Sequence, residues 1–305
     1  MAITAAMVKE LRDITSAGMM DCKKALKETD GDMDAAVDWL RTKGIAKADK
    51  KAERIAAEGL VAAATSGTKG VVVEVNSETD FVARNEIFQA TVAKIATRGL
   101  DVADSASLAA AELEGGKSVT EFLTELVGKI GEKMSFRRME KLEVSQGVVA
   151  SYIHNAVATD MGKIGVLVAL ESSGDTAKLE ELAKKIAMHV AATSPLANTV
   201  ADLDDAVVSK EREMLKAEAL DSGKPEGIVD KMVEGRMQKF FKESVLATQI
   251  FVMDGERSIE KVLEDEGKAL GADIKLMGFV RMAVGEGIEK KEENFAEEVA
   301  AAVKG

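Results

Sequence analysis

The chain of 305 residues is longer than one hydrophobic core usually supports, and 46% hydrophobic with 31% charged residues indicates a globular protein of two or three domains. A net charge of −12 argues against binding to nucleic acid, because that binding depends on Lys and Arg side chains that neutralise phosphates. A single cysteine excludes an intramolecular disulfide, and two histidines leave little for a zinc site, so we expect no metal and no cofactor.

The N-terminus carries no recognisable targeting segment. Residues 1–4 lack the basic and apolar regions of a secretory signal and the Arg-rich character of a transit peptide. No apolar run approaches the roughly 20 residues that a membrane helix needs. We therefore expect a cytoplasmic protein that binds no membrane; an organellar origin would require a presequence already removed.

Residues 1–42 are predicted to form three short helices. Thr4 and Asp32 stand where the N-caps of the first and third helices are expected. The apolar sides of the helices are expected to be Met7, Val8, Leu11 and Ile14, then Met20, Cys22, Ala25 and Leu26, then Met33, Ala36, Val37 and Leu40. With Trp39 packed inside, they predict a small three-helix domain. Residues 43–55 are basic and polar, and we interpret them as a linker, helical or not.

The segment Gly70–Asn76 has the alternation of a strand. Its three odd-numbered valines share one face, and Glu74 and Asn76 share the other. We therefore expect a strand with one buried and one polar face.

The same pattern occurs twice. Gly165–Asp175 repeats the spacing of Gly70–Asp80 at an offset of 95 residues, and in each copy an apolar segment comes before and an amphipathic helix after. The repeat predicts a core of two α+β halves, residues 56–140 and 141–275.

Two further units complete the predicted organisation. Within the second half, residues 204–243 are predicted to form a helical hairpin, because Pro225 suits the start of a second helix after a turn. Residues 276–305 are expected to form a short C-terminal module that ends in a stripe of Phe295, Val299 and Val303.

The octet Glu78–Asn85 places an acidic residue and an aromatic residue at the exit of the first strand. The helical spacing of Phe88, Val92 and Ile95 follows it, so Asp80 and Phe81 are expected in or beside a short strand-to-helix connection. Such connections frequently carry functional residues. The residues alone favour the simpler roles, in which Asp80 caps the next helix and Phe81 folds back into the core.

The sequence resembles the elongation factor Ts family most clearly at Thr79–Ala83, which reads Thr-Asp-Phe-Val-Ala. Other segments resemble the family in the same order over nearly the whole chain: Val8–Arg12, Met19–Leu26, Ile186–Ala192, Lys231–Met237 and Val284–Lys290. The chain departs from the family pattern at Ser16, where glycine is usual, and at Ile250, where proline usually precedes the Phe.

The resemblance implies an architecture and a function. It implies a ubiquitin-associated-like N-terminal domain, a duplicated α+β core with an antiparallel coiled-coil insertion, and a C-terminal module. It also implies a guanine nucleotide exchange factor for the GTPase elongation factor Tu, which itself binds no nucleotide and performs no covalent chemistry. Thr79, Asp80, Phe81 and Val82 would dislodge the partner's Mg²⁺, and Met19, Met20 and His154 would contact the partner.

The two methionines have a simpler interpretation beside the one that the resemblance implies. Of two consecutive residues in a helix, only one can face a small core, so either Met19 or Met20 is expected to be exposed. A single exposed methionine needs no functional explanation.

Several candidate motifs fail on inspection. Gly115–Ser118 imitates the end of a phosphate-binding loop, but the first glycine is replaced by Ala111, and Gly285–Gly287 lacks the third glycine of a dinucleotide fingerprint. Cys22 has no nucleophile signature around it and is expected to be a packed thiol, and His189 is expected at the edge of the core.

Two other classes of function remain open on the sequence. A binding adaptor built on the three-helix domain and the hairpin would bind a partner without altering its nucleotide. A thiol hydrolase would depend on Cys22, and Cys22→Ser would abolish its activity.

Overall fold

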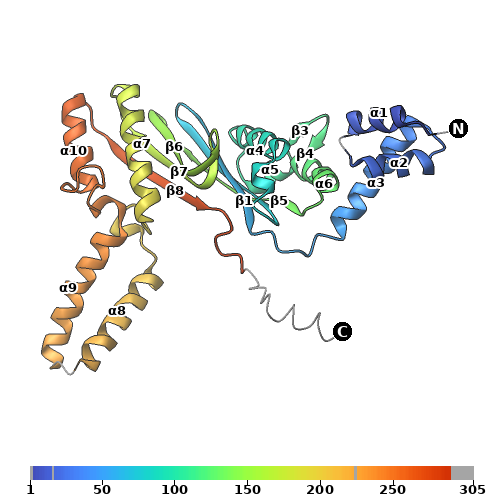
Figure 1. Cartoon of the computed structure of the whole chain (residues 1–305). Helices are drawn as coiled ribbons and strands as arrows, with labels where there is room; N and C mark the ends of the chain where they lie inside the picture. Colours follow the sequence, from blue (N-terminus) through green and yellow to red (C-terminus); the bar gives the residue numbers. More distant parts are fainter. Residues whose placement is uncertain (1–2, 16, 223–224, 290–305) are drawn as a thin grey trace.

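The computed structural model describes residues 3–15, 17–222 and 225–289, which form an α+β structure with an antiparallel sheet between helices (Figure 1). The predicted α+β class is confirmed. The sheet contains β1 (Glu58–Ser66), β2 (Lys69–Ser77), β5 (Met134–Glu143), β6 (Gly147–Ala158), β7 (Met161–Glu171) and β8 (Lys275–Ala283). No helix in the described ranges is long and apolar enough to cross a membrane.

The six strands form two groups of three. In the first trio, β2 pairs with β1 and β5, and in the second trio, β7 pairs with β6 and β8. The trios join where β1 meets the start of β7, with Val61 opposite Gly162 and Ala62 opposite Met161. Each trio is therefore a hairpin plus one strand that returns from later in the chain.

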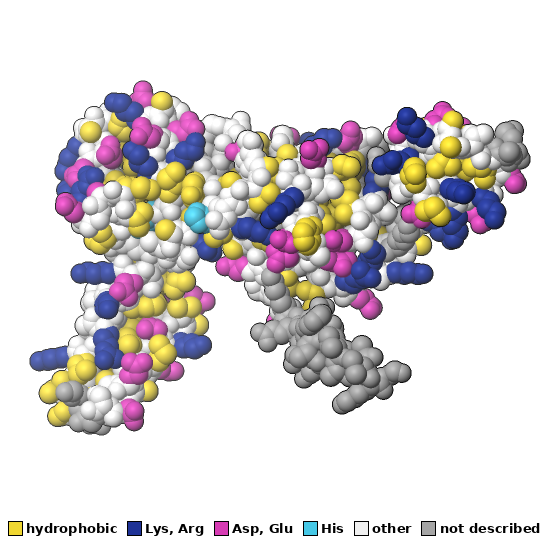
Figure 2. Space-filling view, in the orientation of Figure 1, with side chains coloured by type: hydrophobic (Ala, Val, Ile, Leu, Met, Phe, Trp, Pro, Cys, Tyr) yellow, Lys and Arg dark blue, Asp and Glu magenta, His cyan; other side chains and the backbone are white. Residues whose placement is uncertain are grey.

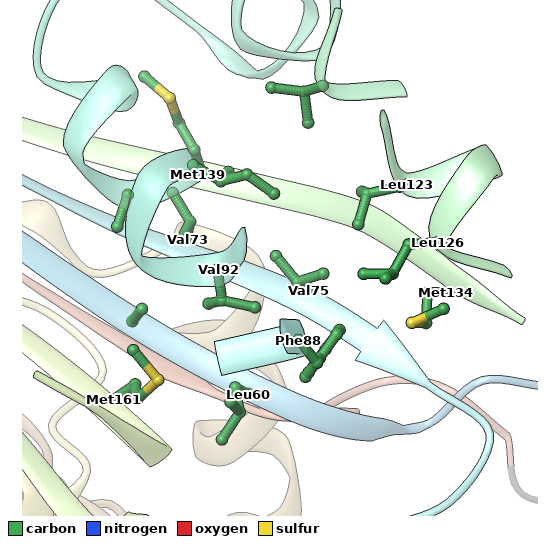
Figure 3. Close-up of a cluster of buried hydrophobic side chains, with 14 of the residues drawn as sticks. Leu60, Val73, Val75, Phe88, Val92, Leu123, Leu126, Met134, Met139 and Met161 are labelled. Carbon is green, nitrogen blue, oxygen red and sulfur yellow. The ribbon is translucent and has the colours of Figure 1, made fainter. Parts of the chain in front are cut away.

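Helices cover one face of each trio. On the first trio lie α4 (Glu86–Gly99) and α6 (Val119–Ile130), and on the second lie α7 (Thr176–Thr193) and α10 (Ile259–Leu270). Phe88 and Val92 of α4 meet Leu60, Val73 and Val75 of the strands in a closed apolar cluster (Figure 3). The side chains on this face of β2 are those that the alternation assigned to the core.

The other faces of the two trios pack against each other. Val61, Val72, Val149, Leu167 and Ala169 form a second buried layer between them. The prediction that β2 has a polar, exposed face is therefore wrong: Glu74 and Asn76 are as buried as the valines. Alternation shows which residues share a face, but it does not show that a second sheet layer covers the other one.

The predicted duplication is visible in backbone detail. Gly59 of β1 and Gly147 of β6 adopt φ of +122° and +123°, and an added Cβ would lie 2.2 Å and 2.1 Å from the carbonyl oxygens of Val75 and Leu170. Only glycine fits so close an approach. Val75 and Leu170 are again 95 residues apart, so the two hairpins begin with the same glycine corner.

The N-terminal helices are α1 (Ala5–Thr15), α2 (Met19–Glu28) and α3 (Met33–Asp49). Thr4 and Asp32 cap α1 and α3 through the amides of Met7 and Ala35, as predicted. Their core is made by Leu11, Cys22, Ala25, Leu26 and Ala36, with Trp39 packed against it. Ile14 and Met20, which we assigned to this core, are 59% and 77% exposed, because each lies at the end of its helix beyond the packed face.

The remaining elements are α5 (Ser105–Ala110), the small hairpin β3–β4 (Glu112–Glu114, Lys117–Ser118), and the helices α8 (Asp205–Asp221) and α9 (Glu226–Ser244). Helices α8 and α9 form the predicted helical hairpin, packed through Leu215, Val233 and Met237. The predicted C-terminal module begins with β8, which belongs to the second trio. The stripe Phe295, Val299 and Val303 lies outside the described residues, as does Ser16.

A clasp of two helices attaches α3 to the first trio. Gly44 of α3 crosses Gly128 of α6, and one turn earlier Arg41 Nε lies 3.4 Å from Glu125 Oε1. One turn later Ala48 packs against the core of the trio. Residues at these spacings share one side of α3, so the helix enters the stretch expected as a linker and docks there. A cavity of about 310 Å³, lined in part by Trp39, lies beside the crossing.

Gly128→Ala is expected to undock the N-terminal helices, because a Cβ at residue 128 would lie 2.8 Å from the Cα of Gly44. The matched control is Gly235→Ala in α9, where an added Cβ meets nothing within 4 Å. That change should stabilise its helix by about 1 kcal/mol, the ordinary advantage of Ala over Gly.

Emission from Trp39, the only tryptophan, and the rate of tryptic cleavage after Lys50, Lys51 or Arg54 report docking. We expect a shifted Trp39 spectrum and faster cleavage for Gly128→Ala alone. If both readouts match those of the unmodified chain, the glycine crossing does not hold the helices.

Candidate functional site

The connection between β2 and α4 carries four of the predicted site residues. It contains a single 3₁₀ turn, Val82–Arg84. Val82 and Ala83 are buried in the core of the first trio, whereas Phe81 is 76% exposed and Asp80 is exposed. The connection is thus anchored by its own apolar residues while it presents an aromatic ring to solvent. We call residues 78–84 the β2–α4 turn.

The two simpler roles for Asp80 and Phe81 are both wrong. The cap of α4 is Asn85, whose Oδ1 accepts hydrogen bonds from the amides of Ile87 (3.0 Å) and Phe88 (3.1 Å). Asp80 caps no helix, and Phe81 does not fold into the core. Neither residue is therefore explained by the packing of the residues that the structure describes.

A comparison of the two halves shows where the turn comes from. In the second half Asp175 caps α7, three residues after Ser172, and in the first half the cap Asn85 lies eight residues after Ser77. Ser77 and Ser172 are related by the repeat of 95 residues, so the first half contains five additional residues. The sequence repeat had matched Asp80 with Asp175, but the structural equivalent of Asp175 is Asn85.

The start of the β2–α4 turn is held by polar contacts. The amide of Thr79 donates to Glu132 Oε2 (2.9 Å), and its hydroxyl donates to Glu132 Oε1 (2.8 Å). The Ser77 hydroxyl donates to the Thr79 carbonyl oxygen (2.9 Å). Sequence reasoning missed Glu132, because 53 residues separate it from Thr79 and no local pattern links them.

Met19 and Met20 are both exposed, by 58% and 77%. The prediction that one of them faces the core is wrong, because the packed side of α2 begins only at Cys22. Ile14, at the end of α1, is also exposed. Figure 2 shows hydrophobic side chains gathered on the surface of the N-terminal helices, next to clusters of Lys and Arg.

His154 lies on β6, far along the chain from the other candidates, and its ring is exposed. Its Nδ1 is 3.2 Å from the Tyr152 hydroxyl, so the tyrosine orients the ring. The structure thus brings Thr79, Asp80, Phe81 and Val82 together in one turn, and it places Met19, Met20 and His154 on two other elements.

Cys22 is a packed thiol. It is fully buried among the N-terminal helices, its Sγ lies 3.6 Å from the Ala17 carbonyl oxygen, and burial raises the pKa of the thiol. Burial and a raised pKa both oppose nucleophilic chemistry. Within the described ranges, no group of three or more His, Cys, Asp or Glu side chains could hold a metal ion.

Gly115 and Gly116 form the left-handed turn of the β3–β4 hairpin, with Lys117 Nζ bonded to Glu125 Oε2 (2.7 Å). Ser118 then caps α6 through the amide of Glu121. The lysine and the serine therefore already have partners within the chain, as an ordinary loop requires.

His189 is a second buried ionisable group. It is fully buried on α7, and its Nε2 lies 2.9 Å from Gln249 Oε1, while its Nδ1 accepts a hydrogen bond from the amide of Val252 (3.2 Å). Burial lowers the pKa of His189, despite the opposing effect of Gln249. His189 thus binds both sides of Ile250, which forms an isolated antiparallel bridge with Ser258 without the usual proline.

Known proteins similar to the chain were identified by comparison. The family model described as Elongation factor TS matches residues 78–286, beginning at the β2–α4 turn. The chain is 60% identical over 305 residues to elongation factor Ts of Maricaulis maris, with 98% of each chain covered. It is 55% identical to elongation factor Ts of Bartonella bacilliformis, with 100% covered, and 56% identical to that of Parvibaculum lavamentivorans, with 99% covered.

His189 is expected to make stability depend on pH near neutrality. The pKa of His189 is lowered in the folded chain. At a pH below the ordinary pKa of about 6.5, the unfolded chain therefore binds a proton more readily at this residue than the folded chain does. Stability should therefore fall as the pH drops from about 7.5 to about 5.5, by at most about 1.4 kcal/mol per pH unit.

Thermal unfolding at several pH values measures this slope. His189→Gln should flatten it, whereas His154→Gln, which changes the exposed histidine, should leave it unchanged. An equal slope in His189→Gln and the unmodified chain would contradict the assignment.

Proposed function

Since the chain belongs to the elongation factor Ts family, we propose that it is a guanine nucleotide exchange factor for elongation factor Tu in translation elongation. It promotes GDP release by disturbing the Mg²⁺ and phosphate site of the GTPase, and GTP then displaces it. The observation that carries this proposal is the anchored β2–α4 turn, which exposes Phe81 and Asp80, while neither caps a helix nor joins a core cluster of the described residues.

The required effect is a negative coupling between two ligands of one GTPase. Nucleotide bound at nanomolar affinity represents about 12 kcal/mol, and Mg²⁺ bridging the phosphates supplies part of it. A factor that binds the Mg²⁺-free form more tightly accelerates release. By reciprocity, nucleotide weakens the factor's binding by the same ratio, so incoming GTP releases the factor without a covalent step.

Phe81 can act as the wedge in this scheme. Burial of a phenylalanine side chain on the partner is worth about 1.5–3 kcal/mol, enough to displace a weakly held element near the ion. Asp80 adds a negative charge next to phosphates that have lost their cation. Val82 is buried in the chain's own core, so it contributes as an anchor, and Thr79 contributes through its hold on Glu132.

Docking needs a second region, and the exposed methionines of α2 supply it. Met19 and Met20 are apolar side chains that this chain leaves in solvent, and such side chains bury well on a partner. We assign His154 on β6 to a third contact. The five units expected from the sequence (1–42, 43–55, 56–140, 141–275 and 276–305) are proposed with borders moved to the elements. Helix α3 continues to Asp49, β5 continues to Glu143, and β8 joins the second half.

In this role the chain itself binds no nucleotide, nucleic acid or membrane. The partner is a GTPase, and the charge of −12 opposes a nucleic-acid ligand.

An adaptor without exchange activity is the competing class, and the rate of GDP release separates the two. Release of a fluorescent GDP analogue from elongation factor Tu at millimolar Mg²⁺ should accelerate at substoichiometric amounts of the chain. Binding without acceleration would support the adaptor.

Phe81→Ala is expected to lower the maximal rate of GDP release at saturating factor by about tenfold to a hundredfold, the equivalent of losing the buried ring. Because Phe81 does not pack inside the chain, thermal stability should not change. Met214→Ala, which truncates a 49% exposed side chain on α8, serves as the control. Exchange by Phe81→Ala at the unmodified rate would contradict the wedge.

Met20→Glu and Met19→Glu are expected to weaken docking, because each would place a charge where an apolar side chain is buried in the complex. The dissociation rate of the complex should rise by about tenfold or more, with a smaller change in the association rate. Surface plasmon resonance measures both rates. Lys23→Glu, at an exposed position on the same helix, controls for charge alone. Unchanged affinity in both methionine variants would remove α2 from the interface.

A further inference from the structure

Glu132 lies just beyond α6, directly after the C-cap Gly131, which is in the left-handed conformation. Both of its carboxylate oxygens bind Thr79, one through the amide and both through the hydroxyl, at 2.8–3.0 Å. The Thr79 carbonyl oxygen is bound by Ser77. All the polar groups of the residue next to Asp80 therefore have partners, and the main one is a carboxylate from another element.

A second carboxylate, Glu78 in the β2–α4 turn, binds the residue that follows Glu132. Glu78 accepts hydrogen bonds from the amide of Lys133 and from Arg54 Nη1 (3.1 Å). Lys133 Nζ in turn donates to the carbonyl oxygen of Arg54 (2.8 Å). The start of the β2–α4 turn, the α6–β5 connection and the segment before β1 thus meet at one point.

We propose that Glu132 is a positioning residue for Phe81, and this inference rests on the proposed exchange function. Its carboxylate fixes the backbone at Thr79, two residues before Phe81, while the buried Val82 and Ala83 fix the backbone on the other side. With both sides fixed, the ring is held in one place before the partner arrives. A wedge that is already ordered does not lose conformational freedom when it inserts.

The contact could instead serve only the stability of the first trio. The two roles predict different kinetics. If Glu132 positions the wedge, its loss lowers the fraction of docked complexes in which Phe81 is inserted, so the maximal rate falls. The half-saturating concentration changes little, because α2 still docks. If Glu132 only stabilises the trio, the folded fraction changes and the maximal rate per folded molecule does not.

The test uses the full chain with Glu132→Ala, Glu132→Gln and, as a control, Glu114→Ala. Glu114 is an exposed carboxylate on β3 that pairs with Lys94 and does not touch the turn. Glutamine keeps an oxygen that accepts a hydrogen bond from the Thr79 amide. Glu132→Gln should therefore keep most of the order of the turn and most of the maximal rate of GDP release. Amide hydrogen exchange of residues 78–84 measures the order of the turn directly, independent of any partner.

For Glu132→Ala we expect faster hydrogen exchange confined to residues 78–84 and a maximal rate of GDP release lowered by roughly tenfold. Glu132→Gln should lie near the unmodified chain, and Glu114→Ala should match it. Faster hydrogen exchange with an unchanged maximal rate would overturn the positioning role, and so would unchanged hydrogen exchange. If the unmodified chain accelerates no release at all, the proposed exchange function fails instead.

Discussion

One buried carboxylate ties together β2, β5 and the end of β8, and the base of the β2–α4 turn depends on it. Glu74 of β2 has no exposed surface, and it accepts hydrogen bonds from Arg137 Nη1 (3.0 Å), Arg138 Nε (2.6 Å), Asn76 Nδ2 (2.9 Å) and the amide of Gly285 (2.8 Å). Burial alone would raise the pKa of Glu74, but these hydrogen bonds outweigh it and hold the pKa below its ordinary value. A buried charge with all these partners is tolerated. Removal of any one partner would leave part of the negative charge of Glu74 uncompensated in the interior.

The partners of Glu74 come from three parts of the chain, which explains why it matters for the fold. The arginines lie on β5, Asn76 on β2, and Gly285 just beyond β8, so the cluster ties the second trio to the first. Arg137 Nη2 also donates to the carbonyl oxygen of Glu286 (2.7 Å). Gly285 has φ of +73°, and an added Cβ would lie 2.2 Å from the carbonyl oxygen of Ala57, so the end of β8 sits directly on the segment before β1. The strand that carries Glu74 ends at the β2–α4 turn, and its fixed position fixes the base of that turn.

Local chemistry could be predicted from the sequence, and contacts between distant segments could not. The caps Thr4 and Asp32, the strand face of Val71, Val73 and Val75, and the repeat of 95 residues follow from patterns a few residues long. The burial of Glu74 does not, because Arg137 and Arg138 lie 63 and 64 residues away from it and Gly285 lies 211 residues away. Likewise, Asp80 is the expected cap of the helix after β2, but the cap of α4 is Asn85. Only the comparison of the two halves shows that five residues were added between strand and cap, and that the added segment exposes Phe81.

Packed contacts between helices also link the two proposed contact regions, α2 and the β2–α4 turn. The helix that leaves the N-terminal cluster is clasped to α6 at Gly44, and α6 leads into Glu132, which holds the β2–α4 turn. Met19, Met20 and Phe81 are therefore joined through α3 and α6 by packed contacts as well as by the linker. If both regions contact one GTPase, their separation is set before binding, and little conformational entropy is lost on docking. That saving matters for an exchange factor, because its contacts must be strong enough to expel nucleotide and yet weak enough for GTP to reverse them. In the proposed mechanism, a few pre-ordered side chains meet this requirement better than a large interface, since the binding energy would come mainly from the Phe81 wedge that GTP would oppose.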